Sequence, residues 1–74
     1  MSPTLSDLPI RKITHVIESL GFVYVRTKGN HAVYRHPDGR AVVIPQYNTV
    51  KRGTLGSILR QPGVTPAEFL ELLH

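Results

Sequence analysis

The stretch KGNHAVYRHPDGR, from Lys28 to Arg40, contains two of the four histidines in this 74-residue chain. His31 follows a Gly-Asn pair, and His36 precedes a Pro-Asp-Gly turn. An imidazole can bind a metal, act as a general acid or base near neutral pH, or remain a solvated surface group. The surrounding sequence favours different interpretations for the two residues.

A metal site is not expected, because zinc needs three or four protein ligands at a workable spacing. The chain has no cysteine, and neither HxxxH nor HExxH occurs. The histidines lie on an expected helix, beside two turns and at the chain end; they are His15, His31, His36 and His74. We expect solvated side chains for His15 and His36.

His31 differs because a tight turn at Gly29-Asn30 can leave backbone N–H groups free to bind an anion. If Lys28-Gly29 forms a two-residue turn, Arg26 lies opposite His31 on the same face of a hairpin. An imidazole with a pKa near ~6.5 can take the proton of an RNA 2′-hydroxyl while a cation neutralises the scissile phosphate. A surface turn histidine is the alternative, and a shift of one residue in register would separate the pair.

Positive charge is concentrated in the middle of a chain whose net charge is +4. Between residues 22 and 60 the only acid is Asp38, against Arg26, Lys28, Arg35, Arg40, Lys51, Arg52 and Arg60. This pattern is typical of a phosphate-binding surface, and a basic solubilising surface is the alternative. Lys51-Arg52 precedes an expected helix start, so this pair either binds phosphate or lies in a solvated loop.

Hydrophobic spacing and turn residues predict one small α+β domain covering residues 1–74. The predicted elements are a helix at 9–20, strands at 22–27, 31–36 and 40–45, a helix at about 54–61, and a last helix after the Thr65-Pro66-Ala67-Glu68 capping box. The order α-β-β-β-α-α places helices on one face of a three-stranded antiparallel sheet and leaves the other face open. Tyr24 and Tyr34 are expected in the core, with base stacking as the alternative. No signal peptide or membrane span is recognised, so we expect a cytoplasmic protein.

Several blocks of sequence, in a consistent order, connect these elements to a known family. They are Leu20-Gly21-Phe22, the Arg-x-x-Gly-Asn-His block at 26–31, Ile44-Pro45, the GTL and ILRQ blocks at 53–55 and 58–61, and Phe69. Together they resemble the HicA toxins, small RNA-cleaving proteins of bacterial and archaeal toxin–antitoxin modules. The resemblance runs from about Leu8 to Leu73.

The resemblance implies a double-stranded-RNA-binding-domain-like fold and an endoribonuclease that cleaves mRNA without a metal or an organic cofactor. Its catalytic histidine corresponds to His31, and a HicB-like antitoxin protein would cover the active surface. Single-stranded RNA would contact the basic centre of the chain, for which the candidates are Arg26, Lys28, Gly29, Asn30, Arg35, Tyr47, Lys51 and Arg52. No membrane partner is implied.

Two positions depart from the family pattern. Many members have a second histidine directly after the catalytic one, where this chain has Ala32, and another shortly after the Val-Pro pair, where it has Tyr47. The identity of a second acid/base group is therefore open. Three classes of function remain: a toxin ribonuclease, a non-catalytic RNA-binding module using the same basic face, and a protein-interaction domain for an acidic partner.

Overall fold

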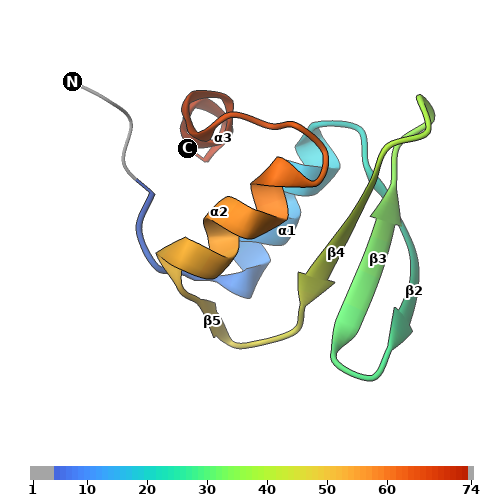
Figure 1. The fold of residues 1–74 in the computed structure, drawn as a ribbon, viewed down its shortest axis with the longest axis horizontal. Coiled ribbons are helices and arrows are strands. Elements are labelled where there is room, and N and C mark those ends of the chain that lie inside the picture. The colour runs from blue at the N-terminus through green and yellow to red at the C-terminus, as the bar shows by residue number, and fades with distance from the viewer. Residues whose placement is uncertain (1–4, 74) are drawn as a thin grey trace.

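The computed structural model describes residues 5–73 and has the predicted α+β architecture. Its elements are β1 (Leu8–Pro9), α1 (Ile10–Ser19), β2 (Val23–Lys28), β3 (His31–Arg35), β4 (Ala41–Pro45), β5 (Thr49–Val50), α2 (Arg52–Arg60) and α3 (Pro66–Leu72). Figure 1 shows the helices on one side of the sheet formed by β2, β3 and β4. The predicted order and the double-stranded-RNA-binding-domain-like fold are confirmed.

The structure differs from the prediction at the start of the second helix and in having two additional short strands. The second helix begins at Arg52, not at Thr54. The strands β1 and β5 were not predicted; they form a separate antiparallel pair in which Leu8 lies opposite Val50. A strand of two residues shows no hydrophobic alternation, so sequence periodicity gives no signal for it.

The core lies between the helices and the sheet. The α1 stripe buries Ile13, Val16 and Ile17 because they recur at helical spacing. The sheet contributes Ala32, Tyr34, Val42 and Ile44, and the remaining helices contribute Leu55, Ile58, Leu59 and Phe69. The capping box at the start of α3 is confirmed: the Thr65 hydroxyl accepts a hydrogen bond from the Glu68 N–H at 3.2 Å, and the Glu68 carboxylate accepts one from the Thr65 N–H at 3.2 Å.

The first hairpin turns at Gly29-Asn30, one residue later than the Lys28-Gly29 turn that the sequence analysis considered. Gly29 has a φ of 60°, which suits the first central position of a type II′ turn and favours glycine there. Lys28 therefore lies opposite His31, and Arg26 lies opposite Val33. The pairing of Arg26 with His31, which depended on a turn at Lys28-Gly29, does not form.

A β-bulge in β2 decides which side chains face outward. Tyr24 lies opposite Tyr34, but the next regular pair joins Arg26 to Val33, so Val25 is the extra residue. Strict alternation would put residues 24 and 26 on one face. Arg26 lies on the open side because it is two residues from Lys28 in unbroken register, and the bulge instead leaves Tyr24 beside Tyr34 on the helical side. Tyr34 is buried as expected, whereas Tyr24 is half exposed and is not in the core.

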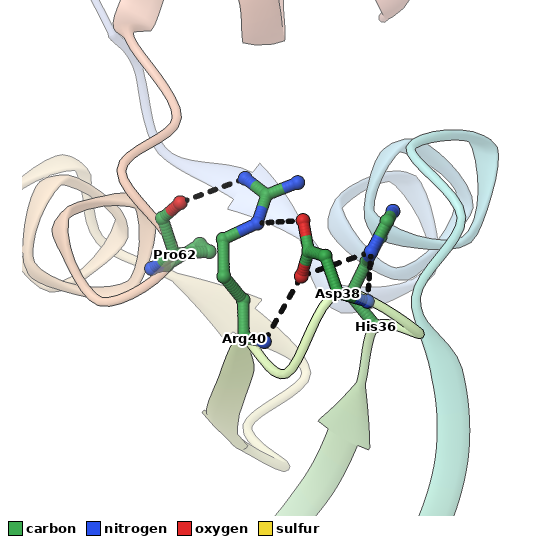
Figure 2. Close-up of polar contacts among 4 residues, drawn as sticks. All are labelled: His36, Asp38, Arg40 and Pro62. Carbon is green, nitrogen blue, oxygen red and sulfur yellow. Dashed lines mark hydrogen bonds and ion pairs between the residues drawn. The ribbon is translucent and has the colours of Figure 1, made fainter.

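His36 is part of a polar cluster, not a solvated side chain, so that prediction is wrong. Its Nδ1 accepts a hydrogen bond from the Asp38 N–H at 3.1 Å, and its ring packs edge-on against Phe22 at 5.1 Å between centroids. As Figure 2 shows, the Asp38 carboxylate also accepts a hydrogen bond from Arg40 Nε at 2.8 Å, while Arg40 Nη1 donates to the Pro62 carbonyl at 2.9 Å. The cluster joins the β3–β4 turn to the segment that connects α2 and α3.

This cluster predicts an acid-sensitive contribution to stability. The Arg40 backbone N–H, followed by its guanidinium, lowers the pKa of the Asp38 carboxyl below its ordinary value of 3.8. A carboxyl whose pKa is lower in the folded state stabilises the protein above its unfolded pKa, and this contribution is lost as the pH falls through the folded pKa. We expect Asp38→Asn to reduce the difference in urea midpoint between pH 7 and pH 3.

The control for this prediction is Glu71→Gln, which neutralises an exposed acid on α3. The Glu71 variant should keep the full pH dependence of the parent protein. An Asp38→Asn protein with the same loss of stability on acidification as the parent would show that the cluster is not the source.

Candidate functional site on the open face of the sheet

The face of the sheet that points away from the helices carries one histidine and several cations. Strand register gives three rows across this open face: Lys28–His31–Pro45, Arg26–Val33–Val43 and Val23–Arg35–Ala41. None of these residues is acidic, and Val33 and Val43 form a half-buried aliphatic floor at the centre. The face thus combines positive charge with an apolar surface on which a base can lie.

His31 lies at one end of this face with its side chain exposed. Lys28 is its direct neighbour across the hairpin, where facing residues have Cβ atoms about 5 Å apart. Arg26 is the diagonal neighbour and Arg35 lies further along β3. Within residues 5–73 the one arginine or lysine paired with a carboxylate is Arg40, with Asp38, so these three cations have no carboxylate partner there. Their charge is available to an anionic ligand.

The turn before His31 is held in place by a hydrogen bond from the segment that follows β4. The Asn30 carbonyl accepts a hydrogen bond from the Gln46 backbone N–H at 2.6 Å. This contact holds the segment after β4 against the Gly29-Asn30 turn. Tyr47 follows Gln46 in the chain, and its side chain is 53% exposed.

Position 32 faces the opposite side of the sheet. Ala32 is buried in the core, and its neighbours in the sheet register are Thr27 and Ile44. A side chain at this position points toward the helices, so Ala32 does not remove a group from the face that carries His31. Tyr34 also points inward, and burial raises the pKa of its phenol above the ordinary value.

Lys51 and Arg52 do not lie on the open face. They begin α2 next to β5, in the helical layer (Figure 1). The Arg52 backbone N–H donates a hydrogen bond to Asp7 Oδ1 at 2.8 Å. One of the N–H groups at the start of α2, which was expected to be free to bind phosphate, is therefore already bonded to a carboxylate of the same chain. The candidate RNA-binding residues thus lie in two separate regions, the open face of the sheet and the start of α2.

The histidines and acidic residues of the described part of the chain do not form a metal site. Among residues 5–73, no group of three or more histidine, aspartate or glutamate side chains gathers closely enough to hold a metal ion. His15 is exposed on α1, and His74 lies outside the described residues. Over the same range, no helix combines the length and apolar character that crossing a membrane requires.

Sequence comparison now places the chain in a family. A family model described as HicA toxin of bacterial toxin-antitoxin matches residues 10–64 of the 74. The chain belongs to the HicA toxin family. The match includes the whole open face and α2, so the HicA assignment covers the part of the chain that carries the candidate site. No curated protein matches the chain.

Membership of the HicA family makes the chain a toxin-type component of a toxin–antitoxin module. The family resemblance noted in the sequence is confirmed. His31 and all three open-face cations are among the candidates predicted from the sequence, whereas the register that decides whether Arg26 or Lys28 lies opposite His31 was left open there. The glycine at the first central position of a type II′ turn was the available signal for the correct register.

Proposed function

We propose that this HicA chain acts as a single-domain endoribonuclease that cleaves mRNA in the cytoplasm without a metal, and that a HicB-like antitoxin neutralises it. The observation that carries the proposal is the open face, where an exposed His31 lies beside Lys28, with Arg26 and Arg35 nearby and no acid among them. A surface that served only solubility would not need to gather cations around one imidazole.

The chemistry requires two proton transfers, one from the nucleophile and one to the leaving group, and a cation that stabilises the developing charge. His31 takes the proton of the 2′-hydroxyl, the 2′-oxygen attacks the adjacent phosphorus, and the bond from phosphorus to the 5′-oxygen breaks. Lys28 neutralises charge that develops on the phosphate oxygens. Water protonates the leaving 5′-oxygen, which gives a cyclic phosphate and a free 5′-hydroxyl.

The direct test is to incubate the purified chain with single-stranded RNA in the presence of a chelator and to analyse the ends of the products. We expect cleavage that the chelator does not reduce, with 2′,3′-cyclic phosphate and 5′-hydroxyl ends. Binding without cleavage would favour the non-catalytic RNA-binding module, and the absence of both would favour a protein-interaction domain.

Lys28 should contribute to RNA affinity through its charge. Each phosphate contact adds roughly 0.7 to the slope of log affinity against log salt for single strands. We expect Lys28→Ala to weaken RNA binding several-fold and to reduce that slope by about 0.7. Fluorescence anisotropy across a salt series measures both quantities.

The matched control for Lys28 is Lys12→Ala, which removes an exposed lysine from α1 in the helical layer. The Lys12 variant should retain the parental affinity and salt slope. Equal effects of the two substitutions would mean that RNA responds to net charge alone and does not bind the open face.

A further inference from the structure

The strand β2 forms an exposed edge of the sheet. In the strand order β2-β3-β4 it pairs on one side only, with β3. All its residues are exposed, including three consecutive apolar side chains: Val23 at 63%, Tyr24 at 51% and Val25 at 43%. An edge strand directs backbone N–H and C=O groups outward, and these groups can pair with another strand.

The other edge of the same sheet is covered from within the chain. The Gln61 side-chain amide accepts a hydrogen bond from the Val43 N–H at 3.1 Å and donates one to the Val43 carbonyl at 3.2 Å. A single amide thus satisfies both outward backbone groups at the centre of β4. No such side-chain contact to the β2 backbone occurs within residues 5–73. The two edges are therefore not equivalent.

The positive charge of β2 favours one kind of binding partner for this edge over a second copy of the chain or RNA. Arg26 and Lys28 lie on this strand without carboxylate partners in residues 5–73, so a second copy of the chain would bring like charges together along the edge. RNA would satisfy the cations but would gain little from Val23 and Val25. An extended protein segment that alternates acidic and apolar side chains would place its acids beside the cations on the open face and its apolar side chains beside Tyr24 on the helical side, while its backbone pairs with the outward groups of β2.

We propose that β2 receives an extended acidic segment of the cognate antitoxin as a fourth strand of the sheet. In this arrangement the acidic side chains face Arg26 and Lys28. Under the function proposed above, on which this regulatory part rests, the same carboxylates neutralise cations that would otherwise hold RNA. The antitoxin thus inhibits by competing for charge on the open face as well as by covering it.

The test uses Val25→Asp, because Val25 is the bulge residue and is not one of the open-face rows. We expect at least a tenfold rise in the Kd for purified antitoxin by calorimetry, from lost apolar contact and added repulsion of the acidic strand. Val25→Lys loses only the apolar contact and should weaken binding less. Leu72→Asp, at a 37% exposed apolar position on α3, is the matched control and should bind normally.

Hydrogen exchange of the complex reports strand pairing independently of any ribonuclease activity. Amides of β2 should gain protection when antitoxin binds, and the Val43 amide, already hydrogen-bonded to Gln61, should not. Unchanged β2 exchange, or parental affinity in Val25→Asp, would overturn the proposal. The affinity and exchange results remain interpretable if the chain fails to cleave RNA.

RNA cleavage and sedimentation of the chain alone test whether RNA or a second copy of the chain binds the β2 edge instead. Without antitoxin, the neutral variant Val25→Ser, which adds no charge beside Arg26, and the parent should cleave RNA at the same rate, and both should sediment as monomers. A parental dimer that Val25→Ser dissociates would identify a second copy as the occupant. A loss of RNA binding in Val25→Ser would identify RNA. Either result would overturn the assignment to the antitoxin.

Discussion

Replacing His31 with alanine should reduce RNA cleavage by about 10² to 10⁴-fold, the usual contribution of a positioned general acid or base. His31 is exposed, so its loss should leave the core and the free energy of unfolding almost unchanged. RNA affinity should change little, because Lys28, Arg26 and Arg35 remain on the face. The measurement is single-turnover cleavage of a labelled single-stranded RNA, together with an unfolding curve.

His15→Ala is the matched control for His31→Ala, because it removes another exposed imidazole, from α1 on the other side of the sheet. It should cleave at the parental rate. Cleavage by His31→Ala at the parental rate would remove His31 from the mechanism even if the protein proves to be a ribonuclease.

Replacing Phe22 with alanine should lower stability by about 3–5 kcal/mol. Phe22 is buried, its ring meets the His36 ring, and the Arg40 guanidinium carbon lies 5.3 Å from its centroid. The substitution leaves a cavity and also removes the surface on which the cluster of His36, Asp38 and Arg40 rests. A chain of this length has a total stability of roughly 4–11 kcal/mol, so the loss is a large share of it.

Urea unfolding followed by circular dichroism measures this loss. Phe22→Leu, which keeps most of the buried apolar volume, should cost less than Phe22→Ala, and Leu72→Ala at a more exposed position should cost little. A loss below about 1 kcal/mol for Phe22→Ala would show that the junction between α1 and β2 is not an essential part of the core.

The elements of the fold could be predicted because their signals are local. Helical spacing identifies α1, and the sequence Thr65-Pro66-Ala67-Glu68 fixes the start of α3 through side chains within one turn. The strands follow from β-branched and aromatic runs between turn residues. The short strands β1 and β5 lack such a signal, because their pairing joins residues about 40 positions apart in the chain.

The role of His36 could not be predicted, because its neighbours come from several segments. Phe22 packs against its ring, and a Cβ on Gly21 would lie 2.9 Å from its Nε2. Gly21 also has a φ of 97°, so both space and backbone conformation favour glycine at that position. The local sequence shows only a histidine next to a turn, which is usually solvated.

By itself the sequence determined the kinds of elements, their order, the HicA resemblance and the choice of His31 as the residue to test. Only the tertiary structure decided which cations share its face. The turn at Gly29-Asn30 puts Lys28 opposite His31 and, by alternation along β2, Arg26 on the same side, while the bulge at Val25 leaves Tyr24 on the other side. A change of one residue in strand register moves every side chain of the strand to the other face. The local sequence predicts that a strand is present but does not predict its register to that precision.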